Sequence, residues 1–573
     1  MQGIGIIVLL LGVVFAGVGY YYYTQPPPKL TLDWWYESSG HYPQSADQAA
    51  VYKSQLEKTG LITVNLHGAD WPSYKKNRDA HTMQVYTYGW YPDYIDPDDY
   101  IQPFLDSVGG SWLGTGYSNP DMDKLIAQAR STPDPTQRAQ LYANIQQIMV
   151  KDAPLVPVWQ GYAWAVTKPD VTGVNLDVTQ NMYYWLITPP AGKDTLIVGT
   201  TDSIETSLDP AELWDYFGAE MSLNLGSSLV YIKAGSSAGP NDFVPGLATD
   251  WSVSPDGLTY TFNLRQGLKF SDGAPFTSAA VKYSFDRNMN LAIPDGPQVG
   301  LAYNATIASV TTPSDYQVVF TLKHSYAPFM ALMAFSGSFI VNPKRAPNVP
   351  GQAVEWKDGD PTASNPNDLG AYLLTEWSRK GGKDYEMKLD ANPNYWGIAD
   401  GYPKAKHIIM KFYSDATALA LAIKSGDIDM AYRQLASSDI KNMQSDPSLK
   451  LWKGPGGIQY IVFQEHMAPL DNPKVRQAIA AALDRNELVN TVFLGQAAPL
   501  YSMIPNGMAF QTDAYKTLGD ANTALATSTL EGLGYSGTTP QSIIQLGLAA
   551  LGVGIVLIVV GAILAARKPK SKA

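Results

Sequence analysis

Two long stretches without charge, one at each end of the chain, constrain its fold most strongly. The first runs from Met1 to Pro28, with Lys29 the first charged residue, and the second covers residues 539–566. An apolar helix of about 20 residues is long enough to cross a bilayer. The part of the 573-residue chain that lies between them is long enough for about two to four domains.

The N-terminal segment, residues 1–28, is expected to be a transmembrane anchor followed by a proline linker. Four consecutive tyrosines, Tyr20 to Tyr23, close its apolar part, and aromatic side chains favour the membrane interface. The alternative is a cleaved signal peptide. Because a basic first segment and an A-x-A cleavage site are both missing, we favour an uncleaved anchor.

The C-terminal segment, residues 543–566, is expected to be a second transmembrane helix. The basic residues of 567–573 then predict a tail on the cytoplasmic side. A buried core helix is the alternative reading. If both segments cross the lipid bilayer, the middle of the chain lies on the extracellular face of the cell membrane.

Composition excludes several classes of function. The chain is 45% hydrophobic and 16% charged, which is typical of a globular protein and argues against disorder. Its net charge of −11 argues against a nucleic-acid partner. The absence of cysteine excludes thiol catalysis, disulfides and cysteine-based metal centres.

The region 30–66 alternates element types and predicts a β-α-β unit. Residues 30–35 and 61–66 are typical of strands, and residues 45–58 have the spacing of an amphipathic helix that Gly60 ends. Further strands and helices alternate along the chain, which predicts a mixed α/β protein with more than one lobe. We expect strands at 83–88, 156–166, 196–200, 260–265, 317–322, 386–389 and 407–412, and helices at 121–130, 136–152, 278–288, 416–425, 473–484 and 486–493.

Catalytic motifs are missing from the sequence. It has six histidines but no H-E-x-x-H spacing, no G-x-S-x-G and no phosphate-binding loop. The pair Asp427 and Asp429 imitates the two carboxylates of a glycosidase only superficially. We therefore expect a protein that is not an enzyme and that has no cofactor and no metal site.

Several long phrases resemble the dipeptide/oligopeptide-binding family (family 5) of substrate-binding proteins of ABC importers. The resemblance covers nearly the whole region between the two apolar ends. The phrases are Pro245-Gly-Leu-Ala-Thr-Asp-Trp251, Pro255-Asp-Gly-Leu-Thr-Tyr-Thr-Phe-Asn-Leu-Arg265 with its continuation to Gly273, Asn392-Pro-Asn-Tyr-Trp396, Lys424-Ser-Gly-Asp-Ile-Asp429 and Val475-Arg-Gln-Ala-Ile479 with Leu483-Asp484-Arg485.

The resemblance implies a fold and a function. The fold would be the two-lobe α/β fold of a periplasmic binding protein (type II, large peptide-binder subclass), with a two-strand hinge near Tyr162 and Tyr460, flanked here by N- and C-terminal transmembrane helices. The protein would capture oligopeptides and deliver them to the permease subunits of an ABC importer by hinge closure. Two alternatives stay open, an oligosaccharide receptor of the same family and a surface-coat protein built on this fold.

The order of the segments departs from the family. The part that resembles the family's beginning is found at 194–536, and the part that resembles its end is found at 30–190, so the chain resembles a circular permutant. Permutation is tolerated where the original ends lie close together at the surface. One lobe would then combine 30–160, which carries the ligand loop, with 458–535, and the remainder of the fold would be 165–455.

The loop from Gly89 through Trp90, Tyr91 and Asp93 to Asp99 is the most informative candidate site. It resembles the family loop whose aspartate pairs with the free α-amine of a peptide, and Asp93 is at the matching position. A carboxylate in a closed cleft forms a charge-assisted hydrogen bond of about 1.5–3 kcal/mol with such an amine. An acidic surface turn and a calcium loop are the alternatives.

The resemblance implies further ligand contacts on both sides of the cleft. Trp71 would form a wall, and the guanidinium of Arg78 suits a peptide carboxylate. From the other lobe, the pairs that line the family's cleft match Trp214 with Tyr216, and Tyr432 with Arg433.

Overall fold

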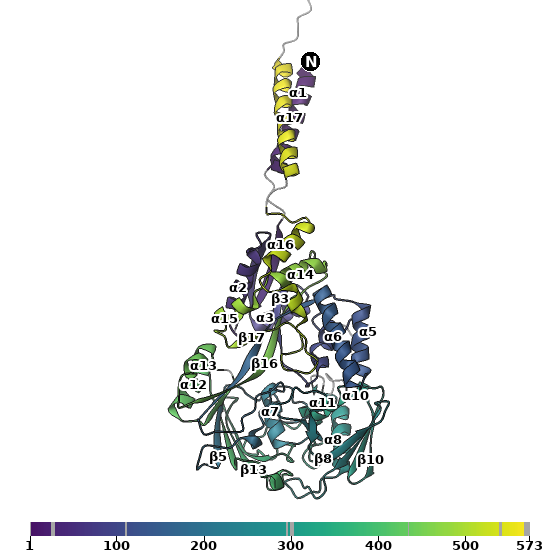
Figure 1. The fold of residues 1–573 in the computed structure, drawn as a ribbon, viewed down its shortest axis with the longest axis vertical. Coiled ribbons are helices and arrows are strands. Elements are labelled where there is room, and N and C mark those ends of the chain that lie inside the picture. Colours follow the sequence, from purple (N-terminus) through teal and green to yellow (C-terminus); the bar gives the residue numbers. More distant parts are fainter. Residues whose placement is uncertain are drawn as a thin grey trace, which may run out of the picture. The chain divides into compact units, whose positions relative to one another are not determined.

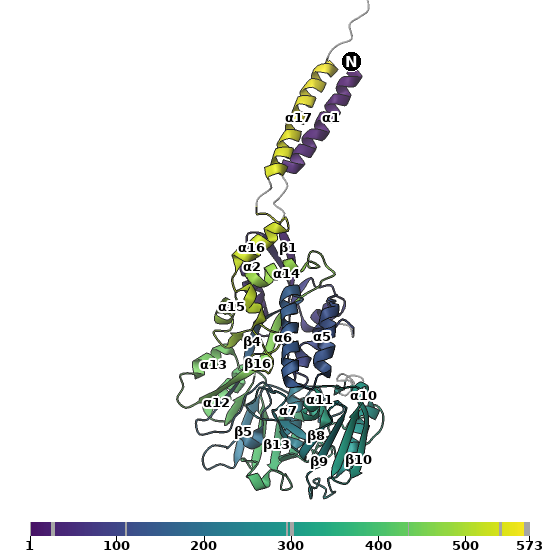
Figure 2. The same cartoon turned by 45° about the vertical axis from the view of Figure 1, so that its right-hand side comes forward.

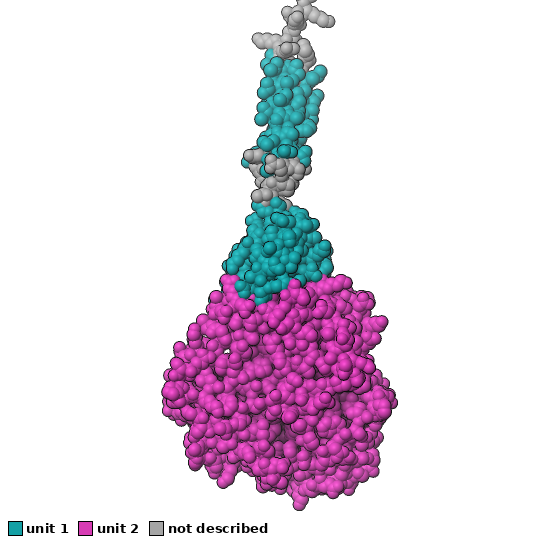
Figure 3. Space-filling view, in the orientation of Figure 1, with its two compact units in different colours: residues 1–86, 463–484, 518–573 teal, residues 87–462, 485–517 magenta. Residues whose placement is uncertain are grey.

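A computed structural model of the chain describes residues 2–23, 29–39, 41–108, 112–293, 296–297, 303–433, 435–537 and 541–566. The predicted basic tail, 567–573, and most of the predicted proline linker, 24–28, lie outside the described residues. The chain divides into two compact units (Figure 3). The first unit comprises Met1–Tyr86, Phe463–Asp484 and Leu518–Ala573, and the second comprises Thr87–Val462 and Arg485–Thr517.

The first unit contains the predicted β-α-β unit, which is confirmed. Strands β1 (Leu30–Glu37) and β2 (Ile62–Ala69) are parallel, with Leu30 opposite Ile62, and helix α2 (Ser45–Glu57) connects them. In β1, Leu30, Leu32 and Trp34 are buried while the residues between them are exposed, as the period of a strand requires. The unit also contains α3 (Trp71–Asp79), α14 (Pro473–Ala482), α16 (Thr523–Gly532) and the start of β3 (Val85–Trp90).

Two apolar helices of the first unit, α1 (Gln2–Tyr23) and α17 (Gln541–Ala566), lie side by side (Figures 1 and 2). They are antiparallel, because Gly12 faces Ile558 and Gly19 faces Leu551. Within α17, Ile544–Ala566 is long and apolar enough to cross a membrane, whereas Ile6–Tyr21 of α1 is a shorter apolar segment.

The second unit is built around a large sheet with the order β12-β13-β14-β5-β15-β4-β16. Its longest strands, β4 (Leu155–Thr167) and β16 (Lys450–Phe463), are antiparallel neighbours, and their register shifts between Pro455 and Ile458. The remaining members are β5 (Thr195–Thr200), β12 (Tyr372–Lys380), β13 (Lys383–Ala391), β14 (His407–Phe412), β15 (Met430–Tyr432) and β17 (Ala497–Pro499), which pairs with β4.

A hydrophobic core in this unit includes buried residues of a four-stranded antiparallel sheet with the order β10-β11-β9-β8. The sheet comprises β8 (Ala248–Val253), β9 (Thr259–Leu264), β10 (Ile307–Ser314) and β11 (Gln317–Leu322), and a separate hairpin is formed by β6 (Val230–Ile232) and β7 (Phe243–Pro245).

Helices and short 3-10 turns complete the second unit. They are η1 (Pro97–Tyr100), α4 (Gln102–Leu105), α5 (Pro120–Ser131), α6 (Pro135–Asp152), η2 (Tyr184–Leu186), α7 (Tyr216–Leu225), α8 (Ser278–Leu291), α10 (Tyr303–Thr306), α11 (Phe329–Ala334), η3 (Ser336–Ser338), η4 (Ile398–Asp400), α12 (Ala416–Ser425), α13 (Ser437–Met443) and α15 (Arg485–Thr491), with η5 (Ala514–Leu518) at a boundary between the units.

Candidate functional site

The loop that follows β3 is fixed by its own carboxylates. Asp96 accepts two hydrogen bonds from the guanidinium of Arg138, at 2.6 and 2.7 Å. Asp98 accepts one from Nε of Arg130 at 3.1 Å and one from the hydroxyl of Tyr94 at 2.8 Å. The Arg138–Asp96 pair is buried and bidentate, so it holds a fixed geometry. Arg130 adds a single contact, and together the two arginines restrain the path of the loop.

Asp99 positions the residue that the sequence singled out. Its Oδ2 accepts hydrogen bonds from the backbone N–H of Asp93 at 2.8 Å and from Nε1 of Trp90 at 3.1 Å. Burial raises the pKa of Asp99 well above its usual value, and the nearby Asp93 adds to this effect. Asp99 therefore holds the backbone of Asp93 in place. Because Asp99 is itself an acid, it does not neutralise the carboxylate of Asp93.

The carboxylate of Asp93 has no counter-charge among the described residues. It forms no hydrogen bond or ion pair with the described residues, and burial raises its pKa to about 7. Such a group gains most from a ligand that brings a positive charge, because the ligand then replaces the water that burial has removed.

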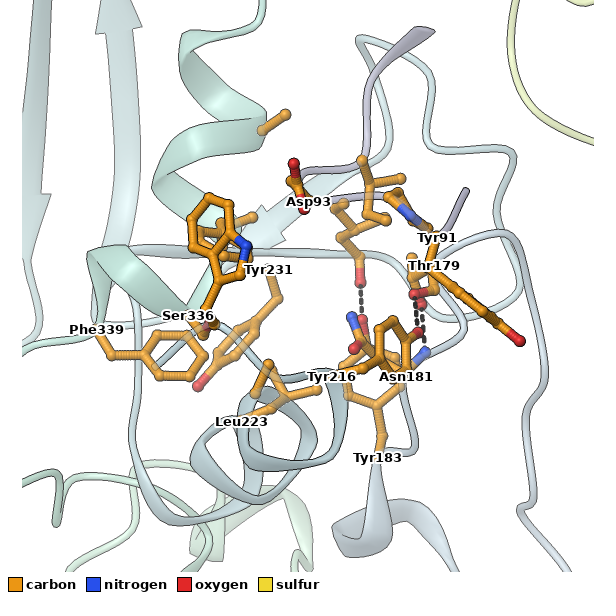
Figure 4. A pocket seen from close by; sticks show the side chains of 18 residues that line it. Tyr91, Asp93, Thr179, Asn181, Tyr183, Tyr216, Leu223, Tyr231, Ser336 and Phe339 are labelled. Carbon is orange, nitrogen blue, oxygen red and sulfur yellow. Dashed lines mark hydrogen bonds between the residues drawn. The ribbon is translucent and has the colours of Figure 1, made fainter. Parts of the chain in front are cut away.

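A cavity of about 140 Å³ opens beside this carboxylate, and we call it the Asp93 cavity (Figure 4). Segments that are far apart in the sequence contribute to it: the loop after β3, the loop before η2, the start of α7, strand β6, helix α11 and η3. It is lined by Tyr91, Pro92, Asp93, Ile95, Thr179, Asn181, Tyr183, Trp214, Tyr216, Ala219, Leu223, Tyr231, Ile232, Ala331, Ala334, Phe335, Ser336 and Phe339.

A second cavity of about 270 Å³, the Arg433 cavity, shares two walls with the first. Tyr91 and Tyr216 line both cavities, and their ring centroids are 5.7 Å apart. The hydroxyl of Tyr216 donates to the carbonyl of Thr179 at 2.9 Å, which fixes this shared wall. The Arg433 cavity is lined by Tyr91, Thr201, Asp202, Ser203, Glu205, Asp215, Tyr216, Phe217 and Arg433.

Two carboxylates hold the side chain of Arg433. Its Nε lies 2.9 Å from Oδ2 of Asp202, and its Nη2 lies 3.4 Å from Oε2 of the fully buried Glu220. Its guanidinium also lies over the ring of Tyr216, 4.6 Å from the centroid. Burial raises the pKa of Glu220 to about 7 although Arg433 opposes the shift. The backbone of Arg433 has a φ of 60°, a strained conformation for a residue with a side chain.

The structure brings some of the predicted site residues together. Asp93, Tyr91, Trp214 and Tyr216 all line the Asp93 cavity, and Arg433 lines the neighbouring one. Gly89 and Trp90 belong to the end of β3 and are not among the lining residues.

Other predicted residues have different surroundings. Tyr432 lies in the hydrophobic core, where its hydroxyl donates to the carbonyl of Gln180 at 3.0 Å. In the first unit, the ring of Trp71 stacks on His41, with centroids 3.6 Å apart, and Nη2 of Arg78 lies 2.7 Å from Oδ1 of Asp79. Both cavities are lined by the second unit alone, so Trp71 and Arg78 are not among their lining residues.

The calcium reading of the acidic loop finds no support in the contacts of its carboxylates. Asp96 and Asp98 face arginines, and Asp99 accepts from an indole and an amide. Throughout the described part of the chain, no three histidine or acidic side chains form a group that could hold a metal ion.

Sequence reasoning missed most of the cavity. Ser336, Phe335 and Phe339 come from a short turn with no recognisable motif, and Asp202 follows β5 in an ordinary polar loop. Only an apolar run ending in Phe335-Ser-Gly-Ser-Phe339 could have drawn attention to this turn, and such runs usually mark a core.

The fold is that of an α/β protein, and loops and helices distant in the sequence enclose its cavity. The family model for bacterial extracellular solute-binding proteins, family 5 (middle), matches residues 18–112 and 242–549, which is more than half of the chain. The chain therefore belongs to family 5 of the extracellular solute-binding proteins. The predicted family and its two-lobe α/β class of fold are confirmed.

Individual relatives are similar over part of their length. The probable D,D-dipeptide-binding periplasmic protein DdpA of Escherichia coli (strain K12) is 29% identical over 323 residues, 55% of this chain and 58% of that protein. The glutathione-binding protein GsiB of Salmonella typhi is 32% identical over 267 residues, 46% of this chain and 48% of that protein. The chain thus spans about half the length of these relatives, which are named as binding proteins and not as enzymes.

Two further comparisons complete this picture. Di/tripeptide-binding protein 2 of Pseudomonas aeruginosa (strain UCBPP-PA14) is 27% identical over 388 residues, 62% of this chain and 70% of that protein. Among solved structures, the periplasmic binding protein DppA of Helicobacter pylori in complex with the peptide STSA has 20% identity and a TM-score of 0.42, covering 62% of this chain and 72% of that one.

Proposed function

We propose that the chain is a membrane-tethered extracellular receptor that binds oligopeptides by their free α-amine and delivers them to an ABC importer. The observation that carries the proposal is the carboxylate of Asp93, which lines a cavity without a counter-charge from the described residues. A ligand ammonium supplies that charge, and a charge-assisted hydrogen bond of this kind contributes about 1.5–3 kcal/mol.

The chemistry of the cavity and the names of the relatives support a peptide ligand. The relatives are named for a D,D-dipeptide, for glutathione and for di- and tripeptides. The lining combines aromatic walls with the hydroxyl and amide groups of Thr179, Asn181 and Ser336. This mixture suits a ligand that has both apolar side chains and a polar backbone.

Hinge closure is the mechanism we propose for capture. The long neighbouring strands β4 and β16 support the predicted two-strand hinge, since Tyr162 lies opposite Pro455 where the register shifts. A ligand that contacts both lobes favours the closed state by its extra contacts there.

The terminal helices support a tether in the lipid bilayer. Helix α17 contains a stretch of membrane-crossing length, and α1 packs along it through glycines. Small residues at a helix interface allow the close backbone approach that is common inside membranes. With antiparallel helices, both ends of the chain would lie on the cytoplasmic side.

Contacts in the first unit also support the circular permutation. A Cβ on Gly537 would lie 3.6 Å from Leu61, and the backbone N–H of Leu30 donates to the carbonyl of Leu61 at 2.9 Å. The two cut ends are therefore neighbours that a short link could join. Under this proposal, 30–160 with 458–535 and 165–455 remain the two parts of the rearranged fold.

Calorimetric titration with paired peptides tests the amine assignment. A peptide with a free amine should bind at least tenfold more tightly than its N-acetylated form, because acetylation removes the charge that Asp93 recognises. Asp93→Asn should abolish this difference, whereas Asp358→Asn, at an exposed site outside both cavities, should leave it intact. Equal affinity of the two peptides for the unaltered protein would contradict the proposal.

An oligosaccharide is the competing ligand class. Its support is the aromatic lining of the cavity, since sugar rings stack on the faces of side chains such as Tyr91, Trp214 and Tyr231. Mass spectrometry of the purified protein separates the two classes. A bound sugar would favour the oligosaccharide receptor, and a cavity that binds neither class would favour the surface-coat protein.

A further inference from the structure

Besides Asp93, another polar side chain that lines the Asp93 cavity forms no hydrogen bond with the described residues. Ser336 begins the 3-10 turn η3 and is only 5% exposed, and its hydroxyl forms no hydrogen bond with the described residues. It is one of the residues that line the cavity. Buried hydroxyls are nearly always hydrogen-bonded, so one that is not requires an explanation.

Ser338, which lies in the same turn, has a hydroxyl whose hydrogen bonds are formed within the protein. Ser338 is also buried, but its hydroxyl lies 2.6 Å from the carbonyl oxygen of Leu332 and 2.7 Å from the hydroxyl of Tyr303. Ser338 does not line the cavity. The turn therefore satisfies the hydroxyl of Ser338 within the protein and leaves that of Ser336, a residue of the cavity lining, without a partner among the described residues.

The cavity has the size of one aromatic ring. Its volume is about 140 Å³, and an engineered apolar cavity of about 150 Å³ is known to hold benzene. Apolar side chains form much of the wall around Ser336, notably Leu223, Ala331, Ala334, Phe335 and Phe339. This part of the cavity suits a flat apolar group better than a charged one.

The two polar groups stand on different sides of the cavity. In Figure 4, Asp93 and Ser336 come from separate segments and stand apart from each other in the view. A residue whose amine contacts Asp93 can therefore direct its side chain across the cavity toward Ser336.

We propose that the Asp93 cavity binds an N-terminal tyrosine, with the ammonium on Asp93, the ring in the apolar part and the phenol hydroxyl hydrogen-bonded to Ser336. This inference rests on the proposed function, because it takes the amine to be the group on Asp93. Its new content is the role of Ser336 and the preference for a hydroxyl at the end of the first side chain.

Titrations of the full-length protein in detergent with Tyr-Ala, Phe-Ala and Ala-Ala test the inference. The unaltered protein should bind Tyr-Ala about fivefold to tenfold more tightly than Phe-Ala, as the gain of one hydrogen bond implies. It should bind Phe-Ala more tightly than Ala-Ala, because the ring removes apolar surface from water. Ser336→Ala should reduce the Tyr-Ala to Phe-Ala ratio to about one.

Ser338→Ala is the matched control in the same turn. It should lower the thermal unfolding midpoint, because it removes two hydrogen bonds made by a buried hydroxyl, but it should keep the preference for tyrosine. Ser336→Ala should not lower the midpoint, since the hydroxyl that it removes has no partner among the described residues.

Two results would overturn the inference: equal binding of Tyr-Ala and Phe-Ala to the unaltered protein, or a preference for tyrosine that survives in Ser336→Ala. N-acetyl-Tyr-Ala separates these results from a failure of the proposed function. If the acetylated dipeptide binds as tightly as Tyr-Ala, the amine assignment itself is wrong. If it binds weakly while tyrosine and phenylalanine remain equal, only the role of Ser336 is wrong.

Discussion

At the scale of the residue, the site is defined by which charges the protein neutralises and which it leaves open. Arg138 neutralises Asp96, Arg130 neutralises Asp98, and Arg433 lies between Asp202 and Glu220. Asp93 has no such partner among the described residues. A binding protein with this distribution keeps its loops in place with internal ion pairs and reserves one carboxylate for its ligand.

The raised pKa of Asp93 predicts a pH dependence of binding. With a pKa of about 7 in the unliganded protein, Asp93 is mostly protonated below pH 7, and a ligand ammonium must displace that proton. Affinity should therefore fall by about tenfold per pH unit well below pH 7. Above about pH 8 it should fall again as the α-amine of the ligand loses its own proton. Calorimetric titrations between pH 5 and pH 9 measure both limbs.

The same shift affects folding, and Asp93→Asn is the control for it. Because the folded pKa lies above the unfolded one, ionised Asp93 costs stability as the pH rises from about 4 to 7. Asp93→Asn should raise the thermal midpoint more at pH 8 than at pH 5, and its peptide affinity should lose the acidic limb. A variant that retained that limb would show that another group titrates.

Arg433→Met should destabilise the protein strongly at neutral and alkaline pH. It leaves Asp202 and the buried Glu220 without their cation, and breaking a buried pair in this way costs about 3–5 kcal/mol. The loss should be smaller at pH 5.5, because Glu220, with a pKa of about 7 even beside Arg433, can take up a proton. Thermal denaturation at the two pH values measures the difference, with Lys411→Met, outside both cavities, as the control.

Part of the site could be predicted from the sequence, and the limit has a physical cause. Asp93, Tyr91, Trp214 and Tyr216 lie within or beside recognisable phrases and do line the cavity. Ser336 and Asp202 could not be found, because the lining is assembled from loops separated by hundreds of residues. Whether a hydroxyl is left without a hydrogen-bond partner depends on how these loops assemble and not on the residues next to it in the sequence.

At the scale of the element, periodicity predicted the strands and helices well. The strand expected at 156–166 is β4 (Leu155–Thr167), and the helix expected at 136–152 is α6 (Pro135–Asp152). The helix expected at 473–484 ends earlier, at Ala482, where the chain turns to extended backbone at Leu483. The order of strands in the large sheet has no local signal, because distant segments pair by their shared buried faces.

Close glycine contacts predict how the two apolar helices tolerate substitution. A Cβ on Gly12 would lie 2.6 Å from the backbone nitrogen of Ile558, and one on Gly19 would lie 2.3 Å from that of Leu551. These distances are too short for any real side chain. Gly12→Leu and Gly19→Leu should therefore separate α1 from α17.

Gly17→Leu is the matched control, because a Cβ there would meet no atom within 4 Å. The chain contains no cysteine, so one cysteine introduced into each of the two helices can be joined selectively by a short bis-maleimide. Cross-linking should occur in the parent and in Gly17→Leu, and it should decrease in Gly12→Leu and Gly19→Leu. Equal cross-linking in all four proteins would contradict the glycine interface.

At the scale of the whole molecule, the proposed permutation makes the chain order testable. Residues 189–192 end near a turn in which the N–H of Lys193 donates to the carbonyl of Pro190, and Gly192 has open space around it. A chain opened there, with Ser536 linked to Lys29 and both apolar helices removed, should fold and bind peptides as tightly as residues 29–537. Circular dichroism and calorimetry compare the two chains, and a reordered chain that did not fold would argue against the permutation.

The antiparallel pairing of α1 with α17 has a consequence for proteolysis. A single cut anywhere between residues 29 and 537 produces two fragments, and each fragment retains one of the two helices. If the pair is embedded in a bilayer, neither fragment is released by that cut, and the fragments also remain joined through their packed glycines. Shedding of the ligand-binding part into the medium would require two separate cleavages, one on each side of it.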